Sequence, residues 1–325
     1  AEETSDASAP VPELAGVVLG PTGQSPPALP ELSPYAKGVR TRVWPGSTIA
    51  FTRRFDAGER SWLLTWDRGI VPSDRVRPYP RSAFEGVVLA GDRRLPLAFF
   101  RARPRPQYRL LPNDEVEPTG KSWPRLGSVG LTGRSVTVEG QSYLQTTEDG
   151  LYCAARDATV ISEAATLPTR VAAATAGRRS WLDISVLGGW LVAYEGTHPV
   201  YATLISPGRG GVPFRGVPPI DTASTPTGQF TVTGKFLTAT MTSTSDANIV
   251  HAEVQYTQNF SGPHALHGAY WHDDWGEKKS GGCVNLSPID AQRIFAWTEP
   301  PLPAGWHGVR WVPGEGDSTT VMIHR

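Results

Sequence analysis

Short runs of alternating apolar and polar residues, interrupted by glycine or proline, recur along most of the sequence and point to a mostly β fold. Alternation places apolar side chains on one face of a strand, while Gly and Pro favour the turns between strands. The 325 residues include 34 Gly and 30 Pro, with frequent Thr and Val, so short strands are expected rather than long helices. A chain of this length has room for two or three domains.

The charge balance and the N-terminal composition narrow the function classes. Lys+Arg and Asp+Glu both number 31, so the chain lacks the clustered positive charge that nucleic-acid binding requires, and no nucleic-acid partner is expected. No apolar run approaches the ~20 residues that span a bilayer, so no transmembrane segment is expected. Residues 1–35 are rich in Ala, Pro, Ser and acidic residues, which predicts a disordered tether. We expect an exported protein of the periplasm or cell envelope whose signal peptide is already removed.

Two stretches of the N-terminal half share a hairpin pattern. Residues 61–74 and 142–157 each read as an aromatic-apolar strand with a Thr, an acidic turn that ends in Gly, and a second apolar strand. The pattern resembles bacterial SH3-like domains. The resemblance implies two small barrels, at 36–81 and 82–162, followed by a linker at 163–178 with one helical turn.

From residue 179 the pattern predicts a β-rich domain with one notable helix. The first two strands are expected to join through Gly188-Gly189, a favoured two-residue hairpin turn. The helix is expected at 287–298, because Ser287 can cap its N-terminus and Pro288 fits its first position. Strands are predicted at 181–186, at 190–194, in a third run through Ile205, within 225–236, at 248–260 and in the C-terminal TTVMIHR.

The chain has only two cysteines, and their surroundings differ. Cys153 falls within a predicted hairpin strand, where an inert, half-buried thiol is expected. Cys283 follows two glycines and precedes the predicted helix, and it could be a packing residue, half of a disulfide with Cys153, a metal ligand or a nucleophile. A nucleophile needs a base that lowers its pKa from about 8.5, backbone N–H donors and open space. A zinc site would draw on a small set of ligands: His264, His267, His272, Asp273 and Cys283.

The segment LHGAYWHDDWGEKKSGGCVNLSPIDAQRIF resembles the active-site signature of the L,D-transpeptidases, the YkuD-type family of peptidoglycan cross-linking enzymes. That signature has a His-Gly, a spacer of about a dozen residues, then Ser/Thr-x-Gly-Cys, an apolar residue and Asn or Arg. Here the His-Gly is His267-Gly268, and the later part runs from Ser280 to Asn285. The resemblance covers about 180–325.

The resemblance implies a division of roles at the site. Cys283 would be the nucleophile and His267 the general base, in preference to His264. The backbone carbonyl of Gly268 would orient the imidazole, the place that an acidic side chain takes in other triads. The amides of Gly282 and Cys283 would form most of the oxyanion hole.

Substrate contacts are implied for a further set of residues. Ser280 and Asn285 would hold the loop and contact substrate, and Tyr256 and Trp271 would contribute a wall or a stacking surface. Gly281 departs from the family pattern, which usually has His and sometimes Arg or Lys there. The contacts that such a basic side chain makes with substrate are therefore not expected in the same form.

The implied reaction needs no cofactor and no metal. Cys283 attacks the L,D-amide before the terminal D-Ala of a peptidoglycan stem peptide, releases D-Ala and leaves a thioester. An amine of an acceptor stem peptide then forms a 3-3 cross-link, and carbapenem-type inhibitors are expected to acylate Cys283. The alternatives are an L,D-carboxypeptidase, in which water is the acceptor, and a non-catalytic peptidoglycan-binding envelope protein.

Overall fold

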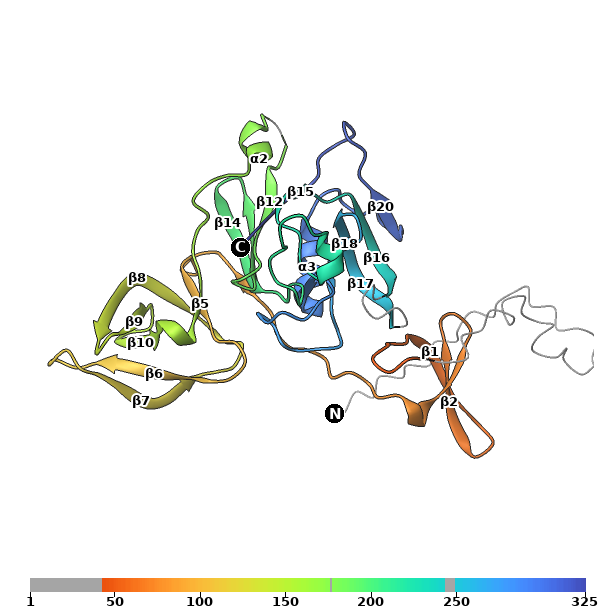
Figure 1. Ribbon diagram of the computed structural model, residues 1–325, viewed down its shortest axis with the longest axis horizontal. Helices are drawn as coiled ribbons and strands as arrows, with labels where there is room; N and C mark the ends of the chain where they lie inside the picture. The colour runs from red at the N-terminus through yellow and green to blue at the C-terminus, as the bar shows by residue number, and fades with distance from the viewer. Residues whose placement is uncertain (1–42, 176, 243–248) are drawn as a thin grey trace, which may run out of the picture. The chain divides into compact units, whose positions relative to one another are not determined.

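The computed structural model describes residues 43–175, 177–242 and 249–325 (Figure 1). The predicted tether at 1–35 lies outside the described residues, as does the start of the first predicted SH3-like module at 36–42. Strands dominate the described part, as the sequence predicts. No helix in the described ranges is long and apolar enough to cross a membrane.

Residues 43–81 contribute a small antiparallel sheet in the order β1-β2-β3. Its strands are β1 (Phe51–Ala57), β2 (Arg60–Thr65) and β3 (Ile70–Pro72), followed by the 3-10 helix η2 (Ser73–Arg75). The hairpin predicted at 61–74 is confirmed, because Trp62 pairs with Pro72 and Leu64 with Ile70.

A seven-stranded sheet follows, in the order β11-β5-β8-β9-β10-β6-β7. Its elements in chain order are β5 (Leu97–Phe99), β6 (Arg105–Leu110), β7 (Val116–Trp123), β8 (Ser128–Val138), β9 (Gln141–Thr146), β10 (Leu151–Ala154), the 3-10 helix η3 (Ala155–Asp157) and β11 (Thr159–Ile161). The hairpin predicted at 142–157 is confirmed by the pairing of β9 with β10. Cys153 is fully buried rather than half-buried as predicted, and burial raises its pKa to about 12, which disfavours the reactive thiolate.

Neither of these sheets is closed in the described ranges, so SH3-like barrels are not confirmed. The region expected as a linker carries the short helix α2 (Thr169–Ala173). The domain boundaries predicted at 82, 163 and 179 stay predictions, and residues Val43–Arg325 group as one compact unit.

A six-stranded sheet begins the C-terminal domain, in the order β15-β21-β12-β13-β14-β4. Its strands are β4 (Val87–Val88), β12 (Ser180–Ser185), β13 (Trp190–Glu195), β14 (His198–Leu204), β15 (Gly228–Thr231) and β21 (Thr320–His324). The two-residue turn expected at Gly188-Gly189 is wrong. Ser185 pairs with Trp190, so the loop has four residues, and the amide of Gly189 bonds the carbonyl of Ser185 at 2.9 Å.

A five-stranded sheet, in the order β19-β18-β17-β16-β20, carries most of the candidate site. Its strands are β16 (Gly234–Thr242), β17 (Val250–Ser261), β18 (His264–Gly268), β19 (Val284–Leu286) and β20 (Gly308–Arg310), with the 3-10 helix η4 (Pro219–Thr222) before them in the chain. The helix α3 (Pro288–Trp297) follows β19, close to the predicted range. The main core lies between the two sheets and α3 and includes Leu182, Leu191, Leu266, Leu286 and Ile294.

Both ends of α3 are capped. The side chain of Ser287 accepts a hydrogen bond from the Asp290 amide at 3.0 Å, which confirms the predicted N-cap. At the other end, the buried ammonium of Lys235 donates to the carbonyls of Phe295 and Thr298 at 2.6 and 2.7 Å. These carbonyls are free of helical partners, so a buried cation there satisfies both.

Residues upstream of 179 complete the C-terminal domain. Strand β4 pairs with β14 at the edge of the six-stranded sheet. The Gly86 amide donates to the buried carboxyl of Asp290 at 3.0 Å, and a Cβ at position 86 would lie 2.5 Å from the carbonyl oxygen of Ala202. A second core covers one face of that sheet and joins upstream Phe84, Leu97, Phe99 and Ile161 to Trp181, Val192, Tyr194 and Leu204.

Candidate active site

A cavity of about 450 Å³ opens over one face of the five-stranded sheet, and both His267 and Cys283 line it. His267 lies in β18, and Cys283 immediately precedes β19. The two strands are parallel neighbours, with His267 paired to Asn285. The fold therefore brings together the two residues that the sequence signature separates by sixteen positions.

The imidazole of His267 is buried and has a defined orientation. Its Nδ1 lies 3.1 Å from the backbone carbonyl of Gly268. A carbonyl only accepts, so Nδ1 carries the proton and Nε2 keeps its lone pair. Burial lowers the pKa of His267 to about 4, although the Gly268 carbonyl opposes this effect. The ring is therefore neutral at pH 7, in the form that can accept a proton.

The thiol of Cys283 is half-buried at the cavity wall. Burial raises its pKa, and the backbone N–H of Ala265 only partly opposes that shift. The positive N-terminal end of a helix lowers the pKa of a thiol next to it, and helix α3 follows Cys283 in the chain. That helix starts five residues later, at Pro288, and the thiol's surroundings penalise the thiolate. Thiol and imidazole are thus both neutral at pH 7 in the same cavity, and the thiol itself donates to the carbonyl of Pro263 at 3.9 Å.

Ser280 and Gly282 shape the backbone that presents the thiol. The Ser280 hydroxyl donates to the carbonyl of Cys283 at 2.5 Å and accepts from the amide of Gly282 at 3.1 Å, so it holds the loop as expected. Gly282 has φ +129°, and a Cβ there would lie 2.9 Å from the carbonyl oxygen of Ser224, so only glycine fits. Its amide, expected to stabilise the oxyanion, is already paired, whereas the Cys283 amide has no acceptor within the described residues.

Asn285 anchors the far side of the same loop. It is buried, and its backbone exchanges two hydrogen bonds of 2.9 Å with Ser206. Its side-chain amide lies 3.1 Å from Nε2 of His272. Asn285 also lines the cavity, so it meets both parts of the sequence expectation on position: it holds the loop and it faces the space for substrate.

Trp271 lines the cavity close to the imidazole of His267, and its predicted stacking on substrate stays a prediction. Its ring lies 5.8 Å from that of His267 and stacks on His251 at 4.2 Å with 8° between the planes. His251 also lines the cavity, although the sequence analysis did not single it out. No local motif marks it, because it comes from β17 and meets Trp271 only through the fold.

One expected substrate contact, that of Tyr256, needs correction. Tyr256 does not line the cavity; its ring packs against Phe295 of α3 at 5.6 Å, on the core side of β17. Gly281 does line the cavity, but its backbone has no need of glycine, and a Cβ there would meet nothing within 4 Å. Position 281 is therefore open space, where a side chain could be accommodated.

Residues 206–209 form a scaffold for the loop that carries Cys283. Pro207 accepts from the amides of Lys279 and Ser280 at 2.9 and 3.1 Å, and the Arg209 amide donates to Ser280 at 2.9 Å. Together with the Ser206–Asn285 pair, these bonds hold both ends of the Cys283 loop. Arg209 and Lys279 also line the cavity, and Lys279 pairs with Asp274 at 2.9 Å.

Upstream residues hold the loop between His267 and Cys283. The Asp273 carboxylate accepts from the Ser82 hydroxyl at 2.6 Å and from the Arg125 guanidinium at 2.9 Å. Trp275 is fully buried, donates to Asp273 at 2.8 Å and stacks on Phe84 at 6.3 Å. The loop that carries Trp271 and His272 is thus fixed partly by residues that precede the C-terminal domain.

Three other interpretations of the site residues were open: a disulfide between the two cysteines, His264 as the base, and a zinc site. Cys153 and Cys283 are both free thiols. His264 is buried, directs Nδ1 to the carbonyl of Ser261 at 3.1 Å and does not line the cavity, which disfavours it as the base. In the described ranges, no three His, Cys, Asp or Glu side chains gather as a metal site would require.

Acidification is expected to destabilise the protein through His267. Its pKa is about 4 in the fold and about 6.5 in the unfolded chain, so the unfolded state binds more protons between these values. Stability is full above pH 6.5 and falls as the pH drops towards 4, by roughly 3 kcal/mol from this residue. His272, whose pKa is also lowered to about 4 by burial, acts in the same direction.

Urea unfolding at pH 7.5, 6 and 5 measures this effect, with His267→Gln as the comparison. The variant should lose less stability on acidification than the parent, because glutamine does not titrate. The buried carboxyl of Asp290, whose pKa burial raises, acts in the opposite direction in both proteins and cancels in the comparison. Parallel pH dependences for the two proteins would contradict the assignment.

Comparisons with known proteins are consistent with this geometry. The sequence profile of the L,D-transpeptidase catalytic domain (YkuD) matches residues 181–323. The comparison with curated proteins finds no match. Among solved structures, an L,D-transpeptidase from Xylanimonas cellulosilytica is 18% identical with a TM-score of 0.31, covering 46% of this chain and 63% of that chain. L,D-transpeptidase 3 from Mycobacterium tuberculosis is 14% identical with a TM-score of 0.34, covering 88% and 98%.

An L,D-transpeptidase from Stackebrandtia nassauensis is 20% identical with a TM-score of 0.30, covering 47% of this chain and 57% of that chain. The chain thus spans about 57–63% of the length of two of these solved structures. Such distant likenesses carry no conclusion about activity. The profile match, in contrast, falls on the part of the chain that holds His267 and Cys283, and residues 181–323 are therefore an L,D-transpeptidase catalytic domain of the YkuD type.

Proposed function

We propose that the protein is a peptidoglycan L,D-transpeptidase that works through a cysteine acyl-enzyme. The observation that carries the proposal is the hydrogen bond from His267 Nδ1 to the Gly268 carbonyl, in a cavity that Cys283 shares. It leaves the lone pair of Nε2 free to accept the proton of the thiol. A neutral base with a low pKa suits a thiol better than a hydroxyl, because the thiol is the stronger acid.

In the first step, Cys283 sulfur attacks the carbonyl of the L,D-amide while His267 Nε2 takes the thiol proton. The amide of Cys283 donates to the developing oxyanion, and the Ser280 bonds hold that amide in place. The imidazolium then protonates the leaving nitrogen, the C–N bond breaks, and D-Ala departs from a thioester.

In the second step, an amine of an acceptor stem peptide attacks the thioester, His267 accepts its proton, and the thiol is restored as the C–S bond breaks. The product is a 3-3 cross-link. Water in place of the amine gives an L,D-carboxypeptidase. Neither step calls for a metal or an organic cofactor, and the substrates place the enzyme in the cell envelope, after export.

The cavity's size and lining support a peptide substrate. About 450 Å³ is ample for several residues of a peptide, and Trp271 and Phe236 offer apolar surface next to polar Asn285. We assign Trp271, Ser280, Gly281 and Asn285 to the substrate cavity. The two upstream sheets, expected as SH3-like modules, would then serve the wall-bound enzyme as spacers or supports.

The test is mass spectrometry of muropeptides after purified sacculi are incubated with the protein. New 3-3 dimers with release of D-Ala support a transpeptidase, whereas tripeptides without dimers indicate a carboxypeptidase. Cys283→Ala is the control and should give neither product. Intact-mass analysis with a carbapenem adds a second readout: an adduct on the parent but not on Cys283→Ala supports the nucleophile, and absence of both products and adduct would favour a binding protein.

A further inference from the structure

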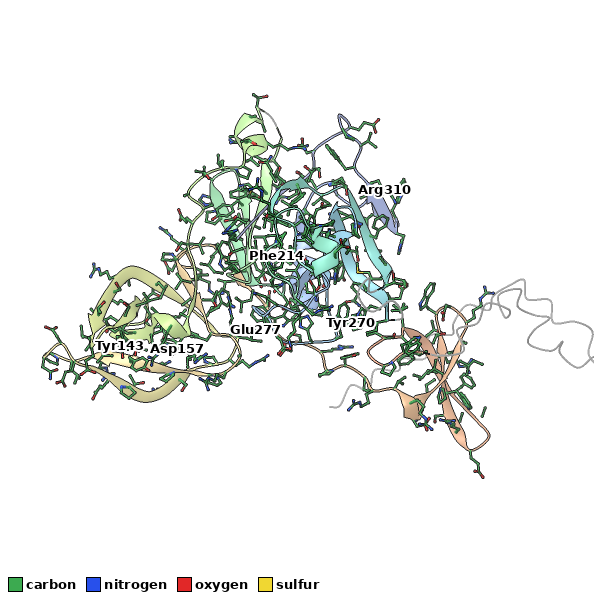
Figure 2. The ribbon with its side chains drawn as sticks, in the orientation of Figure 1. Tyr143, Asp157, Phe214, Tyr270, Glu277 and Arg310 are labelled. Atoms are coloured by element: carbon green, nitrogen blue, oxygen red, sulfur yellow. The ribbon has the colours of Figure 1, made fainter. Side chains whose placement is uncertain are left out.

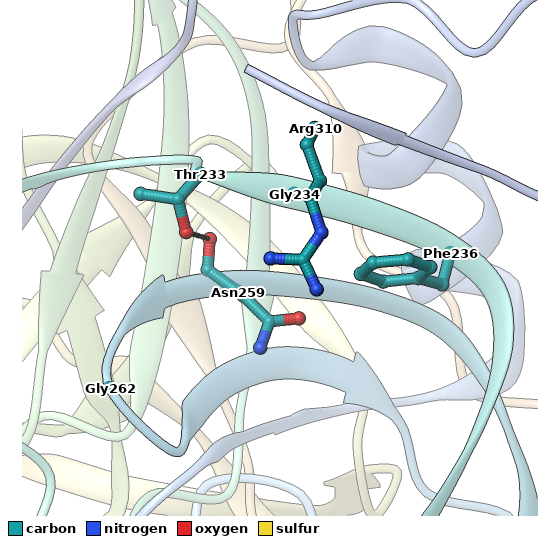
Figure 3. A pocket seen from close by; sticks show the side chains of 6 residues that line it. All are labelled: Thr233, Gly234, Phe236, Asn259, Gly262 and Arg310. Atoms are coloured by element: carbon teal, nitrogen blue, oxygen red, sulfur yellow. Dashed lines mark hydrogen bonds between the residues drawn. The ribbon is translucent and has the colours of Figure 1, made fainter. Parts of the chain in front are cut away.

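A second, smaller pocket adjoins the catalytic cavity. It has a volume of about 140 Å³ and is lined by Thr233, Gly234, Phe236, Asn259, Gly262 and Arg310 (Figure 3). Phe236 and Asn259 also line the catalytic cavity, so the two spaces are neighbours along the same sheet. None of the proposed catalytic residues lies in the smaller pocket, and none of the residues that line it was predicted to have a role.

The register of the five-stranded sheet places this pocket in line with the thiol. Arg310 pairs with Gly234, Gly234 with Asn259, and Asn259 with Ala265. Residues directly opposite one another in an antiparallel sheet point to the same face. Ala265 lines the catalytic cavity beside Cys283, so one row of side chains leads from the nucleophile to Arg310 on the edge strand β20, where Figure 2 shows it.

The row spans three inter-strand steps, roughly 14 Å from Ala265 to Arg310. An extended peptide covers that distance in about four residues. The side chain of Arg310 points back across Gly234 towards Asn259, which shortens the span (Figure 3). A peptide whose scissile amide lies at Cys283 could therefore place a group within about four residues of that amide in the smaller pocket.

Two polar side chains of the pocket, those of Arg310 and Asn259, have no hydrogen-bond or ion-pair partner within the described residues. The Arg310 guanidinium lies 5.8 Å from the centre of the Phe236 ring and forms no ion pair with a described residue. The side-chain amide of Asn259 likewise has no hydrogen-bond partner within the described residues, while its backbone carbonyl accepts from Thr233. Gly234 leaves the space open, since a Cβ there would lie 3.3 Å from Phe236.

The Lys, Arg, Asp and Glu side chains that line the two pockets in the described ranges are all positively charged ones. The described residues lining the two pockets include Arg209, Lys279 and Arg310 but no Asp or Glu. Lys279 already pairs with Asp274, whereas Arg310 presents its planar fork of N–H groups towards the pocket. Such a fork matches the two oxygens of a carboxylate.

We propose that this pocket, formed around Arg310 and Asn259, is a subsite for a carboxylate of the peptide substrate, within about four residues of the reacting amide. The guanidinium binds the carboxylate in bidentate fashion, Asn259 donates a further hydrogen bond, and Phe236 supports the guanidinium. The proposal rests on the proposed function only in that the ligand is a peptide. The carboxylate can belong to the donor or to the acceptor peptide, and the kinetics distinguish them.

The experiment uses pairs of synthetic peptides that are identical except for a free or an amidated carboxyl two to four residues from the scissile bond. With the full chain, kcat/KM for D-Ala release should be about tenfold higher for the free carboxylate at one of these positions. Arg310→Met should remove that preference and leave the amidated peptide unaffected, while Arg310→Lys should retain part of it. Arg215→Met, a change at an exposed arginine outside both pockets, is the matched control.

If the free carboxyl and the Arg310→Met substitution change only the rate at which an amine attacks the thioester, the carboxylate belongs to the acceptor peptide. Equal rates for both peptides in both steps, or an equal loss on both in Arg310→Met, would overturn the proposal. If no D-Ala is released at all, the proposed function fails, and the subsite is then tested by calorimetric binding of the same peptides to Cys283→Ala. Equal affinity for free and amidated peptides at every position would overturn it there.

Discussion

We expect the Cys283→Ser variant to release D-Ala from stem peptides at least about 10³-fold more slowly than the parent. The reason lies in the base. His267 has a pKa of about 4 because it is buried, so it is a weak proton acceptor. It can assist a thiol during attack, but a serine hydroxyl is a far weaker acid than a thiol and would stay protonated.

The substitution should leave the fold intact. Cys283 lies half-buried at the cavity wall, and the loop is held by backbone bonds and by the Ser280 hydroxyl rather than by the sulfur. Thermal unfolding monitored by circular dichroism checks this point. Cys153→Ala, at the buried thiol of the seven-stranded sheet, is the matched control and should keep its activity. Substantial D-Ala release by Cys283→Ser would be incompatible with a sulfur nucleophile.

The His267→Gln variant should acylate about 10²- to 10⁴-fold more slowly than the parent at pH 7. In the mechanism proposed for the parent, a neutral imidazole takes the proton during attack, so little thiolate needs to exist beforehand. Without the imidazole, only the ionised thiol reacts, and burial raises the pKa of Cys283. The rate of the variant should therefore rise about tenfold per pH unit between pH 6 and 8.5 and approach that of the parent at high pH.

The measurement is the pH dependence of kcat/KM for D-Ala release, with carbapenem acylation as a second readout. His264→Gln serves as the control, because His264 bonds Ser261 and lies outside the cavity. Its profile should match that of the parent. A His267→Gln profile parallel to that of the parent would mean that another group, or water, takes the proton.

Local signals in the sequence account for the parts of the site that neighbouring residues build. Ser287 and Pro288 mark the start of α3, and the structure has both in the expected positions. The His267-Gly268 pair is a similar case, since the orienting carbonyl belongs to the very next residue. Such features depend on backbone geometry over a few residues, which the local sequence determines.

The features of the site that the sequence did not predict depend on contacts between segments that are distant in the chain. His251, Asn259 and Arg310 meet the catalytic cavity or its neighbour only through strand register, and no spacing in the sequence reveals that register. Tyr256 sits on the same strand as His251 and Asn259, yet it packs on α3. The raised pKa of Cys283 was also missed, because desolvation is a property of the completed fold.

The core shared by the upstream segment and the six-stranded sheet limits how this protein can be divided and fused to other domains. Phe84, Leu97 and Phe99 cover a sheet face that carries Trp181 and Tyr194, and Ser82 and Arg125 fix the loop that precedes Cys283. A transplant of residues 179–325 onto a foreign anchor would leave aromatic surface bare and the loop unsupported, so we expect aggregation and lost activity. A fragment meant to fold and act when fused to another protein would have to begin ahead of Ser82.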